Sequence, residues 1–504
     1  MNPITTAHAM RAFEEAHFAA GTATPEALML AAGTGAAELF LEFRQSLPDR
    51  ECRRVVILAG HGNNGGDGIV MAQCLAERIP LPVELFLTAE PDKLSGVGRS
   101  FLAELPEQVI VHHQVTPVFQ PGDTVIDALL GTGLSGALRE PYRSWIAALN
   151  AAEVPVFSVD LPSGLGADLA VRADRTAAIG FFKDILFSGE GAACAGTLRR
   201  VPLPLSGAPD SVGEAVDAAA LRQATRRIDN TVHKYRKGSV LLLGGSRDYP
   251  FAPFLSARSA LRAGAGLVRL LIPENCPFPG GVPAGLIVRP LPADAGCFDR
   301  DYDDLPVAYS AKADLVAAGP GLGRNPATAA LIARLCRMEQ PLLLDADGLF
   351  FASQMASEIR RRTAPTLLTP HWGEARILAE GAGITLPDDD PDEAARELAE
   401  AYHSHVILKG RFTRVAAPGG RVVTNTSGSP ALATAGSGDC LTGVAAAFLA
   451  QTRGENMLEQ ASLAVFLHGL TGELAAQRFN TRGVIADDLA DLLPEAWRSV
   501  TFRA

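Results

Sequence analysis

The chain has 504 residues, a length typical of two domains and too great for one ordinary domain. Hydrophobic residues make up 47% and charged residues 20%, which is the composition of a globular protein and excludes a disordered or fibrous one. The formal net charge of −11 argues against general binding to nucleic acid or to an anionic membrane surface. It still permits a small anionic ligand, because backbone N–H groups at helix N-termini bind phosphate locally.

The cysteines and the N-terminus indicate the cellular compartment. The seven cysteines are odd in number and widely spaced, and they include no C-x-x-C pair, so we expect reduced thiols and neither a disulfide framework nor a zinc site. The first residues lack a basic-then-apolar signal pattern. No apolar run approaches the roughly 20 residues that cross a bilayer. We therefore expect a soluble, cytoplasmic protein.

Short apolar runs in the first half are typical of buried parallel strands, at residues 55–60, 83–88, 124–131 and 156–164. Between them, residues 68–79 and 141–152 carry apolar side chains at helical spacing. This alternation predicts a Rossmann-like, doubly wound α/β/α domain, whose ligands bind beyond the carboxyl ends of the strands.

The same alternation starts again after a stretch rich in Ser, Pro, Gly, Asp and Ala. The strands expected there lie at residues 239–246, 267–273, 313–323, 341–349, 365–374 and 405–410. The glycine motifs of the two halves differ, so the chain contains no internal repeat. We expect two α/β domains in tandem, residues 1–220 and 221–504, with the boundary near 210–228.

The sequence GHGNNGGDG at residues 60–68 follows the first expected strand and precedes a helix. Its first glycines fall on G-x-G-x-x-G in the context that a dinucleotide-binding loop requires. The acid that should end the next strand and hold a ribose is missing, because that strand ends at Thr88. An ordinary NAD cofactor site is therefore disfavoured, and a purely structural, glycine-lined turn remains the alternative.

Two neighbouring strand ends favour a ligand pocket. Asp127 runs into GTGLSG at residues 131–136, and Asp160 is followed by LPSGL. A lone aspartate at a strand end is usually a turn former or a helix cap. Acids and glycine turns at several parallel strand ends converge on one crevice, which a structural role explains less well.

These motifs resemble the signature set of the NAD(P)H-hydrate epimerases over roughly residues 5–205. The resemblance implies that the bound dinucleotide is a damaged substrate, NADH or NADPH hydrated at nicotinamide C6 (NADHX and NADPHX). It implies that Asp160 is the acid–base group and that Asn64, Asp127 and Ser163 bind K⁺, with oxygen ligands that suit a hard cation. The substrate-binding residues implied are Asn63, Asn64, Gly65, Gly66, Asp67, Gly131, Thr132, Gly133, Leu134, Ser135, Gly136, Ala137 and Asp160.

In the second half, AGSGDCLTG at residues 435–443 opens an apolar helix. Gly436 and Gly438 free backbone donors at a helix N-terminus, which predicts an anion hole. Asp439 is placed to take a hydroxyl proton during phosphoryl transfer, the alternative being a plain helix cap. Cys440 is interpreted as a small residue in the first turn, at a position that can lower a thiol pKa.

Six further glycine- or charge-bearing stretches follow strand ends in this half, among them HKYRKG, AAGPGLG, TPHWGE and ILKGRFT. No G-x-x-x-x-G-K-[ST] motif is present, so a P-loop is excluded. Asp345 and Asp347 either organise Mg²⁺ or cap the strand, and the sequence leaves both possibilities open.

Together these motifs resemble the ribokinase-like, ADP-dependent NAD(P)H-hydrate dehydratases over about residues 228–500. The resemblance implies that the C6 hydroxyl is phosphorylated by ADP with Mg²⁺ and that phosphate then leaves, which restores NADH or NADPH. On this interpretation Asp439 is the base, and Ala263, Gly321, His371 and Asp439 contact the hydrate. The nucleotide-binding residues implied are Lys409, Gly410, Arg411, Phe412, Thr413 and Gly438.

The leading hypothesis is thus a bifunctional repair enzyme, expected as a homo-oligomer. One alternative is a small-molecule kinase that forms a stable phosphate ester. Another makes the first half a nucleotide-sensing module without catalysis. The reaction product separates the first two, and the role of Asp160 separates the third, because a pure binder needs no acid–base residue at the ring.

Overall fold

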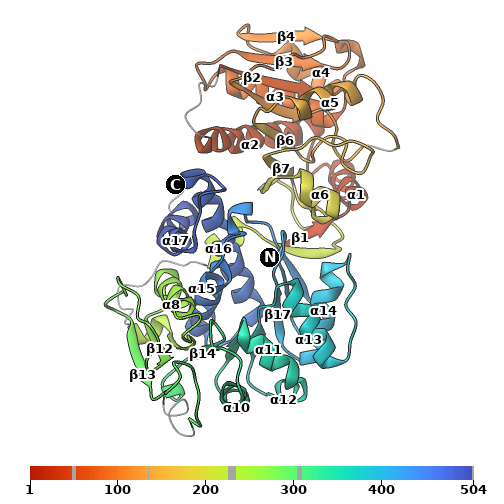
Figure 1. The fold of residues 1–504 in the computed structure, drawn as a ribbon. Coiled ribbons are helices and arrows are strands. Elements are labelled where there is room, and N and C mark those ends of the chain that lie inside the picture. Colours follow the sequence, from red (N-terminus) through yellow and green to blue (C-terminus); the bar gives the residue numbers. More distant parts are fainter. Residues whose placement is uncertain (48–52, 134–135, 225–233, 303–308, 502–504) are drawn as a thin grey trace. The chain divides into compact units, whose positions relative to one another are not determined.

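The computed structural model describes residues 1–47, 53–133, 136–224, 234–302 and 309–501. These residues form two compact units, one of Asn2–Ala215 and one of Val216–Ala504 together with Met1. Each unit is a layered α/β structure (Figure 1), so the expected fold class of two tandem α/β domains is confirmed. Leu134 and Ser135, which the sequence analysis names as substrate-binding, lie outside the described residues.

Within the described part of the N-terminal unit, seven parallel strands form one sheet in the order β4-β3-β2-β5-β6-β7-β9. These strands are β2 (Arg54–Ala59), β3 (Val83–Leu87), β4 (Val109–His113), β5 (Asp123–Ala128), β6 (Val156–Val159), β7 (Arg175–Ile179) and β9 (Thr197–Val201). The short strand β1 (Asn2–Thr5) pairs with β8 (Phe182–Lys183) and β10 (Gly213–Val216). The helices are α1 (Ala7–Ala19), α2 (Pro25–Ser46), α3 (Asn63–Ala76), α4 (Gly96–Ala103), α5 (Tyr142–Ala151) and α6 (Gly189–Cys194).

Alternation along β2 explains why this sheet is covered on both faces. Val55, Ile57 and Ala59 are buried against α2 and α3. Val56 and Leu58 point the other way and are buried against α5. Successive side chains of a strand face opposite sides, so a continuous apolar run requires helices on both faces of the sheet.

The strand order of the N-terminal sheet reverses between β2 and β5. From β2 the chain proceeds outward to β3 and β4, and from β5 it proceeds the other way to β6, β7 and β9. In an open α/β sheet, ligands bind at the carboxyl ends of the strands where the order reverses. The glycine loop after β2 and the glycine turn after β5 both lie at this point.

In the C-terminal unit, parallel strands in the order β13-β12-β11-β14-β15-β16-β17 continue into an antiparallel β17-β18-β19 meander. Their bounds are β11 (Ser239–Leu243), β12 (Leu267–Pro273), β13 (Ile287–Leu291), β14 (Leu315–Ala318), β15 (Leu342–Leu344), β16 (Thr366–Leu368), β17 (His405–Leu408), β18 (Arg414–Ala416) and β19 (Val422–Asn425). Several strands are shorter than the sequence predicts, because the ends of the stretches 313–323, 341–349 and 365–374 form turns and helix starts.

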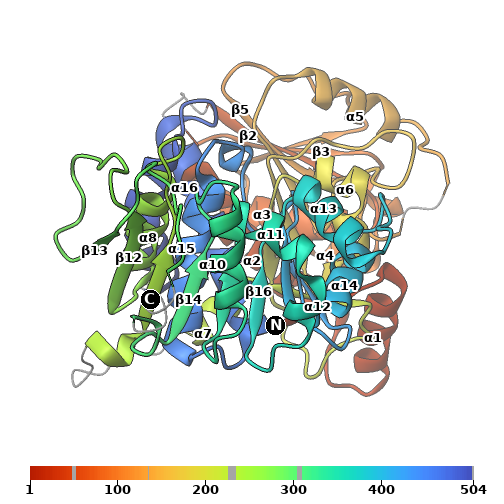
Figure 2. The same cartoon turned by 60° about the horizontal axis from the view of Figure 1, so that its bottom comes forward.

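Helices cover both faces of this second sheet. Val240 and Leu242 of β11 are buried with α8 (Ala252–Ala263), α15 (Ser437–Thr452) and α16 (Met457–Phe479). Leu241 and Leu243 are buried on the opposite face, where α10 and α11 cover the sheet (Figure 2). The remaining helices are α7 (Ala218–Ala224), α10 (Pro326–Leu335), α11 (Asp347–Gln354), α12 (Ala356–Arg360), α13 (Trp372–Ala382), α14 (Pro391–Tyr402) and α17 (Ala486–Thr501). No helix in the described part of the chain is long and apolar enough to cross a membrane.

Candidate active sites

The glycines of the loop after β2 allow backbone segments to pack closely against one another, and they do not adopt unusual backbone angles. A Cβ on Gly60 would lie 1.9 Å from the carbonyl oxygen of Leu129, and a Cβ on Gly65 would lie 1.8 Å from that of Gly60. No glycine of the fully described stretch 60–68 has a positive φ. The predicted helix start at residue 68 is wrong, because α3 already begins at Asn63. The glycines let its first turns pack directly on the ends of β2 and β5.

The N-terminus of α3 is free to bind an anion. Its N-cap residue, Gly62, supplies no side-chain hydrogen bond. The first N–H groups of a helix have no partner within the helix, and the helix dipole adds partial positive charge there. These groups suit a phosphate, such as the pyrophosphate of a dinucleotide.

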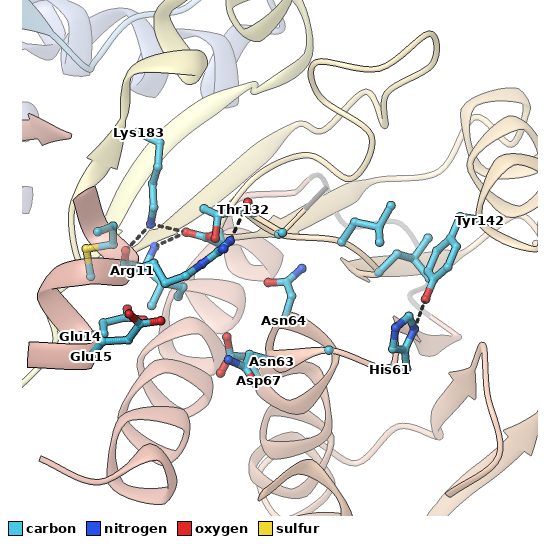
Figure 3. A pocket seen from close by; sticks show the side chains of 18 of the residues that line it. Arg11, Glu14, Glu15, His61, Asn63, Asn64, Asp67, Thr132, Tyr142 and Lys183 are labelled. Carbon is cyan, nitrogen blue, oxygen red and sulfur yellow. Dashed lines mark hydrogen bonds and ion pairs between the residues drawn. The ribbon is translucent and has the colours of Figure 1, made fainter. Parts of the chain in front are cut away.

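A cavity of about 550 Å³ opens at this helix end (Figure 3). Its wall comes from α1, from the loop before α3, from the first turns of α3 and from the turn at residues 129–133. Asp160 and Lys183 also line it. The cavity is large enough for a small-molecule ligand and carries charged groups at one end.

Asp160 and Lys183 form a buried ion pair in the wall of this cavity. The Lys183 Nζ lies 2.5 Å from Asp160 Oδ1 and 2.6 Å from the Ile179 carbonyl oxygen, and Lys183 is 2% exposed. Asp160 has a φ of +63°, a region that residues other than glycine seldom adopt and that is found at functional sites. Sequence reasoning missed Lys183, whose only signal was a buried lysine position in FFKDILF.

Gly131 separates Asn64 from Asp160. A Cβ on Gly131 would lie 3.3 Å from the Asn64 Cβ and 3.4 Å from Asp160 Oδ2, so the turn after β5 lies between these two side chains. Neither amide atom of the buried Asn64 side chain has a hydrogen-bonding partner among the described residues. A buried amide without a partner is costly, which indicates that a ligand or ion completes this site.

Asp127 and Ser163 lie behind the cavity wall in a closed network. Asp127 accepts hydrogen bonds from the Ser163 hydroxyl (2.5 Å), the Ser163 N–H (2.9 Å) and the Ser158 hydroxyl (2.8 Å). Burial raises the pKa of Asp127, and the hydrogen bonds from Ser163 oppose that rise. This network fixes the chain after β6 against the end of β5.

The other residues predicted to bind substrate divide into two groups. Asn63, Asn64 and Asp67 of α3 line the cavity, together with residues 131–133. Gly65 and Gly66 instead pack against Gly60 and Met29 of the same unit. Gly136 and Ala137 are exposed and do not line the cavity.

In the C-terminal unit, Asp439 lies in the first turn of α15. The N-cap Gly436 has a φ of +86° and offers no side-chain cap, so the N–H groups of this turn are left for an anion. Burial is the largest cause that raises the pKa of Asp439 to about 7, and the nearby Asp345 adds to it. A carboxyl group with this pKa can accept a proton near neutral pH.

Lys409 connects this helix to the end of β15. Its Nζ lies 3.1 Å from Asp345 Oδ1 and 3.6 Å from Glu374 Oε2, and a Cβ on Gly438 would lie 3.6 Å from it. Burial acts to lower the pKa of Lys409, but the two carboxylates outweigh it and raise that pKa. The lysine therefore presents a positive charge beside the α15 N-terminus, where a phosphate would bind.

Asp345 anchors this lysine. It is 2% exposed and accepts hydrogen bonds from the hydroxyls of Thr369 (2.7 Å) and Thr442 (2.6 Å) besides its pairing with Lys409. Asp347 has different partners: it accepts a hydrogen bond from the Gly323 N–H and forms an ion pair with Arg324. Asp347 thus closes the GPGLG turn, which favours the structural role for this residue over a Mg²⁺ role.

The predicted nucleotide-binding segment is the tight turn between β17 and β18. The Thr413 hydroxyl donates to the Gly410 carbonyl oxygen at 3.2 Å and accepts from the Gly410 N–H at 3.3 Å. The guanidinium of Arg411 lies 4.5 Å from the centre of the Phe412 ring. The turn therefore holds Lys409 at one end and an exposed, stacked arginine beyond it.

His371 is the N-cap of α13. Its Nδ1 accepts the N–H of Gly373 at 2.9 Å, and Glu374 in turn accepts the N–H of His371. Because Nδ1 accepts, the proton of the neutral ring lies on Nε2, which is 3.7 Å from Glu374 Oε2, and the His371 side chain as a whole is exposed.

Gly321 and Ala263 belong to two other segments of the C-terminal unit, the turn after β14 and the end of α8. Gly321 packs against the Tyr249 carbonyl oxygen, with a φ of +63°. Ala263 is 1% exposed, at the end of α8. The adjoining Gly264 meets Gln451, which lies three turns along α15 from Asp439.

The environment of Cys440 corrects one expectation. Its pKa is raised to about 12 by burial, whereas the sequence analysis allowed a lowered one, so burial outweighs the helix N-terminus here. Sequence reasoning also missed a contact of Ser437, in the same helix turn. The Ser437 hydroxyl lies 3.4 Å from Nε2 of His468, a buried residue of α16. Burial lowers the pKa of His468 to about 4. This histidine is neutral near pH 7.

Both sites share a construction. A helix with an uncapped, glycine-rich N-terminus lies beside a carboxylate paired with a lysine that is fully or partly buried, at the carboxyl ends of a mostly parallel sheet. This defines a two-site α/β enzyme that binds phosphate-bearing ligands.

Comparison with known proteins identifies the family. Residues 240–495 match the family described as NAD(P)H-hydrate dehydratase, and residues 25–185 match the family described as YjeF-related protein N-terminus. A bifunctional NAD(P)H-hydrate repair enzyme of Salinibacter ruber is 36% identical, over 98% of this chain and 95% of its own. One of Gloeobacter violaceus is 38% identical, over 95% of each chain. The chain belongs to the family of bifunctional NAD(P)H-hydrate repair enzymes.

A solved structure is similar to the second unit. The ADP/ATP-dependent NAD(P)H-hydrate dehydratase of Bacillus subtilis, crystallised with ATP and Mg²⁺, is 27% identical. The similarity covers 57% of this chain and 99% of that one, with a TM-score of 0.48.

Proposed function

We propose that this chain restores NADH and NADPH from their C6 hydrates in two steps. The N-terminal unit interconverts the R and S hydrates, and the C-terminal unit dehydrates the S form at the expense of ADP, giving AMP and phosphate. The observation that carries the proposal is the position of Lys409, which is paired with Asp345 and acts electrostatically on Asp439 at the uncapped N-terminus of α15. Family membership supports both steps.

In the dehydratase step, Asp439 takes the proton of the C6 hydroxyl while that oxygen attacks the terminal phosphorus of ADP. The bond to the bridging oxygen breaks and AMP leaves. Lys409 and the N–H groups around Gly438 stabilise the charge on the transferring phosphoryl group. Loss of phosphate and of a ring proton then restores the dihydronicotinamide.

Mg²⁺ neutralises nucleotide phosphates when it is bound. The described residues hold no cluster of three or more His, Cys, Asp or Glu side chains that could bind a metal. Asp345 and Asp347 are both engaged with other groups. The phosphates themselves and water are therefore the main Mg²⁺ ligands that we propose, which is common for this ion.

In the epimerase step, Asp160 is the proposed acid–base group at the ring. Lys183 and the Ile179 N–H hold its Oδ1, which leaves Oδ2 on the side of Gly131 and the cavity. A residue fixed in this way can exchange a proton at one defined oxygen. The phosphates of the substrate are placed at the start of α3.

A potassium site at Asn64, Asp127 and Ser163 is part of the proposal. The unpartnered Asn64 amide fits such an ion, and amide, carboxylate and hydroxyl oxygens suit a hard cation. K⁺ would offset substrate phosphate charge. The expected result is a higher melting temperature of the chain in KCl than in NaCl of equal ionic strength, and N64A removes that difference.

Other residues complete the proposal. The proposed contacts of the S hydrate remain Ala263, Gly321 and His371. The proposed contacts of the adenine nucleotide remain residues 409–413. A cytoplasmic location agrees with the free thiols of the described cysteines. The homo-oligomeric state is to be measured by light scattering.

The decisive experiment gives the full chain a mixture of R and S NADH hydrate with ADP, Mg²⁺ and K⁺ and follows the return of NADH absorbance. Complete recovery faster than spontaneous epimerisation supports both activities. Recovery that stops at the S fraction removes the epimerase step. No recovery with ADP or ATP removes the proposal and favours a small-molecule kinase.

A further inference from the structure

Helix α1 contributes an acidic side chain to the epimerase cavity. Glu14 lines the cavity with Asp67, Asp160 and Lys183. In Figure 3, Glu14 and Asp67 lie on the lower side of the cavity and Lys183 on the upper side. Helix α1 precedes the matched family segment, which begins at residue 25, and no resemblance noted above assigns Glu14 a role.

The charges around Glu14 do not balance. Asp67 is nine-tenths buried, and its carboxyl group accepts no hydrogen bond from the described residues. Asp160 is already paired with Lys183. The Arg11 guanidinium donates to the Thr132 carbonyl oxygen on the rim of the cavity. Burying several carboxylates without matching cations is costly, which favours the protonated forms of Glu14 and Asp67.

The electrostatics agree with this arrangement. Burial is the largest cause that raises the pKa of Glu14. The positive charge of Lys183 opposes this rise, and the negative charge of Asp160 adds to it. Burial raises the pKa of Asp67 still more, and Asp160 and Glu14 add to it. The charged groups that face Glu14 are Arg11 and Glu15 of its own helix, Asp67 of α3, Asp160 after β6 and Lys183 of β8.

We propose that Glu14 is the proton donor and acceptor on one face of the hydrated nicotinamide ring, across the cavity from the Asp160–Lys183 pair. This inference rests on the proposed epimerase function. Glu14 lines the cavity and is only half-buried, so we expect it to exchange protons with solvent between turnovers.

The reaction balances without a co-reactant. Glu14 gives its proton to the C6 hydroxyl, the C6–O bond breaks, and water leaves with the electron pair. The lone pair of the ring nitrogen forms the C6=N bond. Water then adds to the opposite face of C6, and its proton passes to the Asp160 carboxylate. In the reverse direction the two carboxyl groups exchange roles.

The test compares Glu14→Gln with the surface control Glu26→Gln in the full chain. Purified R hydrate with ADP measures epimerisation, and purified S hydrate measures dehydration alone. We expect E14Q to lower the epimerase kcat by about 100-fold, a typical loss for a general acid, with KM changed by less than about three-fold. E26Q leaves both activities unchanged. E14Q leaves dehydration of the S hydrate unchanged.

The pH profile separates proton transfer from a structural effect. The wild-type kcat for epimerisation falls at high pH as the Glu14 carboxyl group loses its proton. This fall in kcat at high pH should be absent in E14Q. It should remain in Glu14→Asp, which keeps a carboxyl group. A wild-type kcat and profile in E14Q, or an equal loss of both activities, overturns the inference. Failure of the wild-type protein to consume R hydrate overturns the epimerase function itself.

Discussion

Replacing Glu374 by glutamine tests the electrostatic control of Asp439. The Glu374 carboxylate contributes to the raised pKa of Asp439 and lies 3.6 Å from Lys409. Glutamine keeps the size of the side chain and an oxygen that can still accept the His371 N–H. The substitution therefore removes a negative charge and preserves the helix cap. The expected result is a lower pKa of Asp439.

The size of the effect follows from the pKa of about 7. At pH 6 a group with this pKa is about one-tenth carboxylate, and only the carboxylate accepts the hydroxyl proton. If loss of the charge lowers the pKa by about one unit, equal to about 1.4 kcal/mol, half of the molecules are active at pH 6. The E374Q rate at pH 6 should then rise about five-fold. At pH 8.5 both proteins are fully ionised and should be equal.

The assay is the pH dependence of kcat/KM for S hydrate at saturating ADP. The control is Glu380→Gln, on the exposed side of the same helix, which should not move the acid limb. Asp439→Asn should lower the rate by at least 100-fold at every pH. An acid limb that stays in place in E374Q refutes the electrostatic argument, and a D439N enzyme of wild-type rate refutes the role of Asp439.

Three further predictions concern stability, each measured by urea unfolding. Gly60→Ala places a methyl group against a backbone oxygen and should cost about 3 kcal/mol, whereas Gly62→Ala, which meets open space, should cost less than about 1 kcal/mol; equal costs contradict the close-packing account. Lys183→Met leaves a buried carboxylate unpaired and should cost about 3–5 kcal/mol, which Asp160→Asn in the same chain should largely restore. His405 has a folded-state pKa of about 4, below its unfolded value of 6.5, so the folded state binds fewer protons than the unfolded state between these values. Unfolding free energy should therefore fall by about 2–3 kcal/mol from this residue between pH 7 and pH 4.5, and His405→Gln should lack that part of the slope.

The sequence by itself determines the two α/β units and most of their strands. Apolar runs such as RVVILA read as buried strands because both faces of a parallel sheet are covered. It also determines the two glycine-bordered helix starts and the aspartates beside them, since these residues are contiguous in the chain. Asp439 is recognised for that reason and Asp160 because it ends an expected strand before LPSGL, and the family resemblance adds their roles. The comparisons confirm the family.

Only the tertiary structure decided which distant side chains complete each site. Lys183 pairs with Asp160, and Glu14 joins the same cavity from a helix near the N-terminus. His468 meets the start of α15 from another helix. No local pattern marks such residues, because a lysine or glutamate at helical or strand spacing normally faces solvent. Their burial and their pKa values depend on which elements the folded sheet brings together.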